Sequence, residues 1–254
     1  MEQYMTKSLR KMGKSDLGNE EVREYVLEKT YEAFVRFLNR DRNQHRPEPN
    51  KIYVTELAKE CPRSVMFGRV FGDYFLQLKD LVVLMLGELI HSVPILESGH
   101  EVEIEWEGIR GRIDEYDEEK GILIEKKTTR KLPSSPYPHH VKQLQIYMFM
   151  LTKLEKPVRH MFLWYFDLTN PDDPVRVFRV EPQISLNFEQ ELLMKRDALI
   201  FALKSGKIPP RKITWYCRYC KYAHLCFMPE SDIQKLVELA RKTNFGTLLY
   251  GEYE

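Results

Sequence analysis

Two acidic side chains and a lysine between residues 111 and 130 have a spacing that suits metal-dependent phosphodiester chemistry. This segment has the pattern of two short strands, and residues i and i+2 of a strand share a face. Glu125 and Lys127 therefore lie together on the second strand, and Asp114 on the first can face the same side. Two converging carboxylates favour Mg²⁺ or Mn²⁺. A lysine beside them can position water or offset charge on a phosphate.

An ordinary solvated sheet face would carry the same residue types. Opposite charges on neighbouring surface strands stabilise each other by about 0.2–1 kcal/mol, so spacing alone leaves both interpretations open. Flanking residues favour the metal site: His91 lies one helical turn after Gly87, which lets another element approach, and Gln143 and Tyr147 share a helix face at i and i+4. Taken singly, His91 also fits a histidine buried in the core, and Gln143 and Tyr147 also fit a solvated helix stripe.

The four cysteines form a second group of possible ligands. Cys217 and Cys220 have the C-x-x-C spacing of metal ligands, Cys226 follows closely, and Cys61 lies far upstream. This spacing suits zinc as readily as an iron–sulfur cluster, and buried unliganded thiols are the structural alternative. With Cys61 as the fourth ligand, the centre would tie the early part of the chain to its end, and its loss would destabilise the fold.

Helices and strands must position both groups. Helical spacing of apolar residues predicts helices at 20–39, from Thr55 onward with a bend or interruption at Pro62, and at 76–97, 140–154, 186–205 and 230–243. Alternating or continuous apolar runs predict strands at 101–108, 109–117, 121–129, 158–166 and 175–181, with a hairpin turn at 117–121. This order predicts an α/β fold with a mixed central sheet flanked by helices.

The totals restrict the class of protein. With 254 residues, 43% of them apolar, the chain can bury a substantial core and is not expected to be disordered. A net charge of +1 means that any basic surface for nucleic acid must be local. No apolar run approaches the roughly 20 residues that cross a bilayer, and the N-terminal residues lack the apolar core of a signal peptide. We therefore expect a cytoplasmic protein with reduced thiols and no membrane partner.

Four motifs, in order, resemble the RecB-like nucleases of the PD-(D/E)xK superfamily. They are G-x-x-x-H ending at His91, G-x-I-D ending at Asp114, E-x-K from Glu125 to Lys127, and Q-x-x-x-Y from Gln143 to Tyr147. The resemblance covers roughly residues 85 to 150 and implies a restriction-endonuclease-like core. The metal-binding residues that it implies are His91, Asp114, Glu125 and Lys126. The catalytic residues that it implies are Asp114, Glu125, Lys127, Gln143 and Tyr147.

One cysteine before these motifs and C-x2-C-x5-C after them resemble the arrangement of iron–sulfur RecB-like nucleases. Residues 55–69 and the compact length most resemble the CRISPR-associated Cas-four exonuclease family. This resemblance spans about residues 52 to 228. It implies a 4Fe–4S cluster, with zinc as the alternative, bound by Cys61, Cys217, Cys220 and Cys226.

The chain is expected to contain one nuclease domain with an extension. Residues 1–50 are predicted to form an N-terminal helical extension and linker, followed by the nuclease domain over 51–254. The iron–sulfur cluster region of that domain would be built from about residues 52–70 and 213–230.

A basic, aromatic stretch accompanies the cysteines. Residues 204–221 contain six Lys and Arg and no acid, and aromatic residues lie among them at Trp215, Tyr216, Tyr219 and Tyr222. Positive charge follows a phosphate backbone and aromatic faces stack on single-stranded bases, although packing around the metal centre would use the same residues. The proline-rich basic segment 126–140 can flank a DNA channel, and its His139 and His140 are expected to be exposed loop residues.

The function expected from these features is that of a divalent-metal-dependent exonuclease acting on single-stranded DNA ends. The Cas-four resemblance implies trimming of DNA before its capture as CRISPR spacers, alongside integrase proteins, with the oligomeric state left open. One alternative is a non-catalytic DNA-binding adaptor, and another is a RecB-like repair or viral nuclease outside CRISPR adaptation. The complete set of catalytic side chains favours an enzyme.

Overall fold

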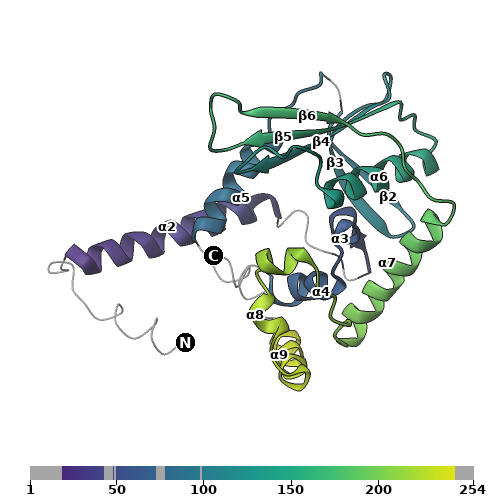
Figure 1. Ribbon diagram of the computed structural model, residues 1–254. Coiled ribbons are helices and arrows are strands. Elements are labelled where there is room, and N and C mark those ends of the chain that lie inside the picture. The colour runs from purple at the N-terminus through teal and green to yellow at the C-terminus, as the bar shows by residue number, and fades with distance from the viewer. Residues whose placement is uncertain (1–18, 43–47, 49, 73–77, 98, 244–254) are drawn as a thin grey trace.

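A mixed six-stranded sheet forms the upper layer of the protein in Figure 1. The computed structural model describes residues 19–42, 48, 50–72, 78–97 and 99–243. The strand order is β1-β3-β4-β5-β6, and β2 also pairs with β3. The strands are β1 (Ile52–Tyr53), β2 (His100–Trp106), β3 (Ile109–Asp117), β4 (Ile122–Thr129), β5 (His160–Asp167) and β6 (Val175–Arg179).

The two edges of β3 are used differently, and the difference creates a fork in the sheet. β2 pairs antiparallel along one edge of β3, from Ile109 to Glu115. The other edge pairs in parallel with β1 at residues 109–110 and antiparallel with β4 at residues 115–117. Residues 111–114 lie between these two pairings. β4 pairs with β3 only at residues 122–124, while it pairs in parallel with β5 along its whole length, from Ile122 to Thr129. The sheet is therefore open where Asp114 and Glu125 lie.

Helices cover the sheet and form a second layer below it in Figure 1. α6 and α3 lie against the sheet, α7 borders it, and α4, α8 and α9 lie together beneath. α2 contacts α5 and projects away from the rest. The helices are α2 (Asn19–Arg42), α3 (Val54–Ala58), α4 (Pro62–Phe71), α5 (Leu78–His91), α6 (Pro138–Lys153), α7 (Phe188–Ser205), the 3-10 helix η1 (Trp215–Tyr219), α8 (Ala223–Cys226) and α9 (Glu230–Lys242).

Two hydrophobic cores stabilise the fold. The larger joins the sheet to α3, α6 and α7, and α6 is buried from Gln143 to Leu151. The smaller joins α4 to α8 and α9 and includes partly buried Cys220 and Cys226. The sequence of α9 explains why this segment is helical. Ile233 and Val237 repeat at i and i+4 on the buried face, with acidic residues in the first turn and basic residues in the last.

The predicted helices and strands are confirmed in type and order, with one earlier helix end and with short elements that were not predicted. The predicted interruption at Pro62 is confirmed, because Pro62 occupies the first turn of α4, after Cys61 at the N-cap, and α3 and α4 are separate helices. α5 ends at His91, because buried side chains bind the backbone of residues 91–96. The short strand β1 was not predicted, because two residues carry no periodicity. Within the described part of the chain, no helix is both long and apolar enough to cross a membrane.

Gly111 lies at the fork and allows close packing there. A Cβ atom at this position would collide with the ring of Tyr147 and would lie 2.8 Å from Cγ2 of Val54. Because real Cβ atoms do not approach so closely, any side chain would force α6 or α3 away from β3.

We predict that Gly111→Ala lowers the free energy of unfolding by roughly 1–3 kcal/mol, the usual cost of overpacking a well-packed core. Urea denaturation measures the change. Gly68→Ala is the matched control, because its Cβ would meet only the Tyr222 hydroxyl, at 3.7 Å, and alanine favours the helix. Equal stabilities for Gly111→Ala and the wild type would contradict the prediction.

Candidate active site

Asp114 bridges the two strands at the fork. It lies on β3 where β3 and β4 no longer pair, and its side chain is buried, with 8% of the residue exposed. Its Oδ2 accepts a hydrogen bond from the backbone N–H of Lys126 at 2.7 Å. Its Oδ1 is 2.8 Å from Nδ1 of His91, at the end of α5. Asp114 therefore joins β3 to both β4 and α5.

Glu125 is the most deeply buried carboxylate of this group, with 2% of the residue exposed. Its Oε1 accepts hydrogen bonds from Lys127 Nζ at 2.7 Å and from Gln143 Nε2 at 2.5 Å. Its Oε2 is buried and has no hydrogen-bond partner among the described residues. Burial, followed by the negative charge of Asp114, raises the pKa of Glu125 to about 7. An unsatisfied buried carboxylate oxygen suits a cation.

His91 and Asp114 form a pair in which the histidine favours the ionised carboxylate. Burial would raise the pKa of Asp114, but the hydrogen bond and charge of His91 and the charge of Lys127 hold it below its ordinary value. α5 packs close to β4 at Gly87, where a Cβ atom would be 3.4 Å from Oγ1 of Thr128, about the van der Waals contact distance.

Gln143 and Tyr147 lie one turn apart on α6 and hold Glu125 from the helix side. The Tyr147 hydroxyl donates a hydrogen bond to the Arg112 carbonyl at 2.8 Å, and Gln143 Nε2 lies 3.4 Å from that hydroxyl. Burial and the charge of Glu125 raise the pKa of Tyr147 well above its ordinary value, so that it remains a neutral donor. The solvated helix stripe considered above is excluded, since both side chains are buried.

The structure therefore brings together six of the predicted site residues, namely His91, Asp114, Glu125, Lys127, Gln143 and Tyr147. Their donors and acceptors pair with one another: His91 with Asp114, and Lys127 with Glu125. Within the described ranges, no three His, Cys, Asp or Glu side chains are close enough to share one metal ion in this arrangement. Binding of an ion by these side chains would require some of these pairs to open.

The side chain of Lys126 does not belong to this group. It points to the opposite face of β4, where its Nζ lies 2.8 Å from Oε1 of Glu115, and both side chains are fully buried. Its Nζ also donates hydrogen bonds to the carbonyls of His91, at 3.1 Å, and Val93, at 2.6 Å. Only its backbone N–H reaches the site, through Asp114.

Glu115, which the sequence analysis missed, completes an anchor for the end of α5. Its carboxylate accepts hydrogen bonds from the backbone N–H groups of Ile95, at 3.0 Å, and Leu96, at 3.2 Å. Glu115 and Lys126 thereby attach residues 91–96 to the sheet, next to His91. A signal was present in the sequence: strand alternation puts Lys126 on the face of Ile124, and a charge on an apolar face needs a partner.

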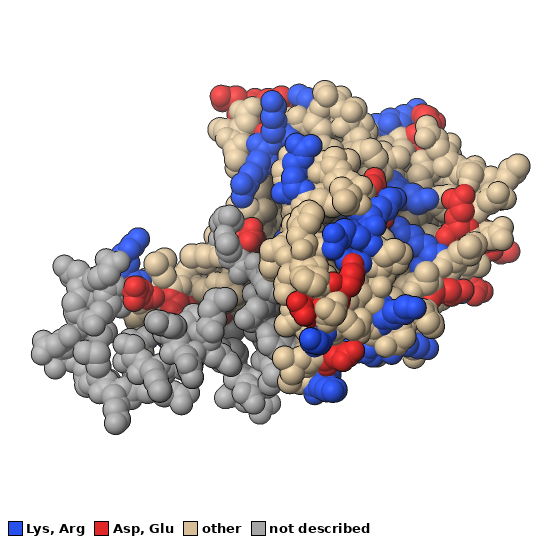
Figure 2. All heavy atoms as spheres, turned by 60° about the horizontal axis from the view of Figure 1, so that its bottom comes forward, with Lys and Arg blue, Asp and Glu red and all other residues tan. Residues whose placement is uncertain are grey.

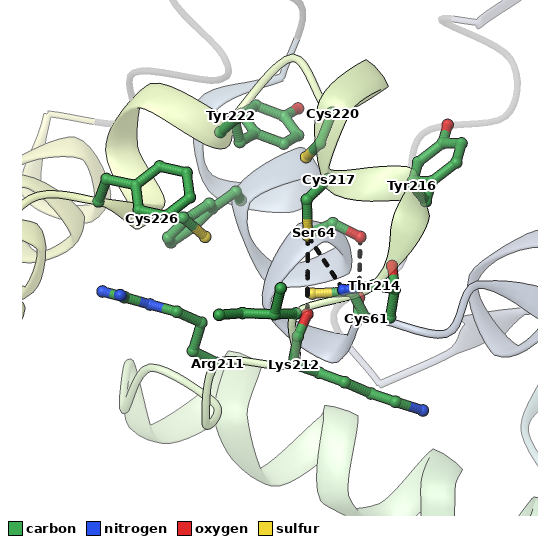
Figure 3. A pocket seen from close by; sticks show the side chains of 14 residues that line it. Cys61, Ser64, Arg211, Lys212, Thr214, Tyr216, Cys217, Cys220, Tyr222 and Cys226 are labelled. Atoms are coloured by element: carbon green, nitrogen blue, oxygen red, sulfur yellow. Dashed lines mark hydrogen bonds between the residues drawn. The ribbon is translucent and has the colours of Figure 1, made fainter.

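The four cysteines line one pocket, although Cys61 is separated from the others by more than half the chain. Their side chains lie around a common space between α4 and the segment that contains η1 and α8 (Figure 3). The backbone nitrogen of Thr214 lies 3.4 Å from Sγ of Cys217. Burial raises the pKa of both Cys220 and Cys226. Positive charge at these thiols favours their ionised form, and a metal centre can supply it.

Basic charge is local, as the net charge of the chain predicts. Figure 2 shows Lys and Arg in small groups among Asp and Glu, rather than in one uniform field. In the cysteine-rich segment, Trp215 and Tyr219 are exposed, and the guanidinium of Arg218 lies 5.6 Å from the centre of the Tyr219 ring.

His139 and His140 are not the exposed loop residues that were expected. Both lie in the first turn of α6 and are partly buried. Burial, followed by the charge of Lys127, lowers the pKa of His140 to about 2 and also lowers that of His139. Pro138 begins the helix, which the sequence analysis placed two residues later.

The sequence model of the PD-(D/E)XK nuclease superfamily matches residues 15–227, most of the chain. The chain belongs to this superfamily. The predicted fold class is thereby confirmed, and the protein is a nuclease whose substrate is DNA. Nucleases of this superfamily use divalent metal ions, and the buried carboxylates described above have the chemistry to bind one.

This nuclease is similar over most of its length to a known exonuclease and to a solved structure. It is 27% identical over 222 residues to the "CRISPR-associated exonuclease Cas4" of Saccharolobus solfataricus, which covers 81% of this chain and 97% of the relative. The crystal structure of SSO0001 superposes with a TM-score of 0.52 at 26% identity, covering 81% of this nuclease and 96% of that chain. The predicted resemblance to the Cas-four exonucleases is therefore confirmed.

We predict that Lys126→Met lowers the free energy of unfolding by about 3–5 kcal/mol, because it leaves the Glu115 carboxylate buried without its counter-charge. Urea denaturation measures the loss. The double variant Glu115→Gln, Lys126→Met should lose less than Lys126→Met alone, because no buried charge then remains unpaired.

Lys120→Met is the matched control for this prediction. Lys120 is paired with Asp117 at 3.0 Å, but its side chain is 68% exposed, and exposed pairs contribute at most about 1 kcal/mol. Equal losses for Lys120→Met and Lys126→Met would show that the buried pair has no special role.

The pKa of Glu125 predicts a pH dependence of stability in the presence of EDTA. Its pKa of about 7 in the folded chain exceeds the ordinary value of 4.5. Folding therefore favours the protonated form, and stability is lost as the pH rises from about 4.5 to about 7. Glu125→Gln lacks this loss, so that its stability relative to the wild type should improve by roughly 2–3 kcal/mol between pH 5 and pH 8. Parallel stability curves for the two proteins would refute the assignment.

Proposed function

We propose that this nuclease is a divalent-metal-dependent exonuclease that hydrolyses phosphodiester bonds at single-stranded DNA ends. The observation that carries the proposal is the buried carboxylate of Glu125, with one unsatisfied oxygen, beside Asp114 and Lys127. In a stable fold, an unsatisfied buried carboxylate oxygen calls for an explanation, and a cation is one.

In this proposal His91, Asp114 and Glu125 hold the ion, which is Mn²⁺ or Mg²⁺. Carboxylate oxygens suit both cations, and imidazole is a better ligand for Mn²⁺ than for Mg²⁺. A divalent cation bound here would polarise the scissile phosphate and lower the pKa of water. Lys126 contributes its backbone N–H to the orientation of Asp114, and its side chain plays no direct part.

The other residues of the proposed site have separate roles. Lys127 provides positive charge at the reacting phosphate and positions water, because its ammonium group is partly exposed and lies next to Glu125. Gln143 holds Oε1 of Glu125 and thereby leaves Oε2 directed to the ion. Tyr147 positions Gln143 and anchors α6 to β3 through the Arg112 carbonyl.

We predict that the wild-type protein degrades end-labelled single-stranded DNA in Mn²⁺ and that Lys127→Ala lowers the rate by at least about 100-fold, the loss typical of a charge-stabilising group. Denaturing electrophoresis of the labelled strand measures both. Lys120→Ala is the matched control, because Lys120 is exposed and far from Glu125 in the pairing of the strands. Equal cleavage by Lys127→Ala and the wild type would place the activity elsewhere. DNA binding without cleavage by the wild type would favour the adaptor.

We further propose that Cys61, Cys217, Cys220 and Cys226 bind a 4Fe–4S cluster. Support comes from their shared pocket and from thiolate being the preferred ligand of iron–sulfur clusters. Each thiolate of such a cluster binds a different iron, whereas tetrahedral zinc requires all four sulfurs within reach of one ion. In this proposal the cluster joins residues 52–70 to 213–230 within a nuclease domain over 51–254, and residues 1–50 form an extension.

We predict that the protein purified without oxygen is brown, with visible absorbance from thiolate-to-iron charge transfer, and contains about four iron atoms per chain. Cys226→Ala should lose this absorbance and the thermal stability that the cluster contributes. Metal analysis by mass spectrometry is the second readout. One zinc per chain, without visible absorbance, would show that the four cysteines bind zinc and not an iron–sulfur cluster.

We propose a role in CRISPR adaptation for this activity, with CRISPR integrase proteins as partners in the cytoplasm. Support comes from the similarity to a CRISPR-associated exonuclease over 97% of that relative's length. Trimming of single-stranded ends would prepare DNA fragments for integration. Co-purification with a CRISPR integrase tests the partnership, and its absence would contradict it.

A further inference from the structure

Aromatic rings form a continuous row between the catalytic strands and the cysteine-rich segment. Consecutive ring centres along this row are 5.8–6.2 Å apart, within the range of direct aromatic contact. The row joins three segments that are distant in sequence: β5, the start of α6, and η1. Its members, which we call the aromatic row, are Tyr165, Tyr137, His139, Tyr216, Trp215 and Tyr219, in that order.

One end of the aromatic row lies at Lys127. Tyr165 is the partner of Lys127 in the register of β4 and β5, so that the two side chains leave the sheet on the same face. The Tyr165 hydroxyl accepts a hydrogen bond from the Tyr137 backbone N–H at 3.1 Å, which fixes the next ring of the row. His139 then stacks on Tyr137 with an angle of 20° between the ring planes.

The other end of the row is exposed and basic. Trp215, Tyr216 and Tyr219 are 47%, 43% and 65% exposed, so that each ring keeps a face open to solvent, although Tyr216 also lines the cysteine pocket. Figure 3 shows Tyr216 at the rim of the cysteine pocket, with its hydroxyl directed away from the sulfur atoms. Arg218 lies against Tyr219 and donates a hydrogen bond to the Trp215 carbonyl at 3.2 Å.

We propose that the aromatic row is the track along which a single strand of DNA reaches the active site, with bases stacked on its exposed rings, Trp215, Tyr216 and Tyr219, and a phosphate against Arg218. Tyr165 is fully buried, so that it fixes the inner end of the row and does not stack on a base. The inference rests on the proposed function for its substrate and adds the path and the residues. Three exposed rings with the guanidinium of Arg218 beside them match a strand whose bases are free. A duplex keeps its bases stacked inside, and an apolar peptide would leave the positive charge without a partner.

The first test measures binding of labelled oligothymidine by fluorescence anisotropy in EDTA, where no cleavage occurs. Tyr216→Ala and Trp215→Ala should each weaken binding roughly 5-fold to 150-fold, the loss expected for one base–aromatic stack. Tyr216→Phe should bind like the wild type, because the ring is retained. The control is Phe201→Ala, which removes a ring of α7 that is 63% exposed and outside the row, and which should change nothing.

Strands without bases separate stacking from phosphate contacts. An abasic strand of the same length should bind wild type and Tyr216→Ala equally, since it has nothing to stack. Arg218→Gln should weaken both strands and reduce the slope of log affinity against log salt by roughly 0.7, the value for one phosphate contact on a single strand. Equal binding of oligothymidine by wild type and both alanine variants would overturn the proposal, as would equal losses on abasic and base-bearing strands.

A small substrate without bases separates catalysis from the binding of DNA. Hydrolysis of bis(p-nitrophenyl) phosphate in Mn²⁺ requires the catalytic residues but no DNA track, so that Tyr216→Ala should retain the wild-type rate. If the wild type hydrolyses neither this compound nor DNA, the proposed exonuclease activity is wrong. The binding measurements then still test whether the aromatic row binds a single strand. If Tyr216→Ala loses hydrolysis of the small phosphodiester, the ring acts on the active site rather than on the strand, and the track is refuted.

Discussion

Buried charge at the middle of the sheet is the constraint on which the rest of the structure depends. Asp114, Glu115, Glu125 and Lys126 are at most 8% exposed, and each ionised group loses solvation that it would have in water. The fold offsets this cost by arranging partners around them. β3 and β4 separate so that Asp114 can bind the Lys126 N–H, α5 ends where its backbone meets Lys126 and Glu115, and α6 brings Gln143 to Glu125.

The same two strands serve structure on one face and chemistry on the other. On one face, Glu115 and Lys126 satisfy each other and the backbone around them, which anchors the end of α5 to the sheet. On the other face, Glu125 keeps an oxygen without a partner among the described residues and a raised pKa. A fully satisfied network stabilises, whereas an incompletely satisfied one has the capacity to bind a ligand. Alternation of side chains along a strand places the two functions one residue apart.

The small core around α4, α8 and α9 gives the cysteines a fixed setting. α4 begins directly after Cys61, and Cys220 and Cys226 contribute to the same core from the other end of the chain. Positions at both ends of the sequence are therefore held by ordinary apolar packing as well as by any bound metal. The rings that extend from this core toward Lys127 connect it to the proposed active site, so that in our proposal one strand of DNA contacts both.

Local periodicity and motif order determined the strands, most helices, the proposed site residues and the superfamily, because a period of two or 3.6 residues is written in neighbouring positions. The helix boundary at His91, the two-residue strand β1 and the burial of His140 were decided only in the tertiary structure. The pairing of Lys126 with Glu115 was also decided only in the tertiary structure. The sequence shows that Lys126 needs a partner, but it does not show which residue that partner is. These features depend on contacts between residues far apart in sequence, and the packing of α5, α6 and β5 selects them. The sequence thus determined which side chains share a face, and the fold decided which of them meet.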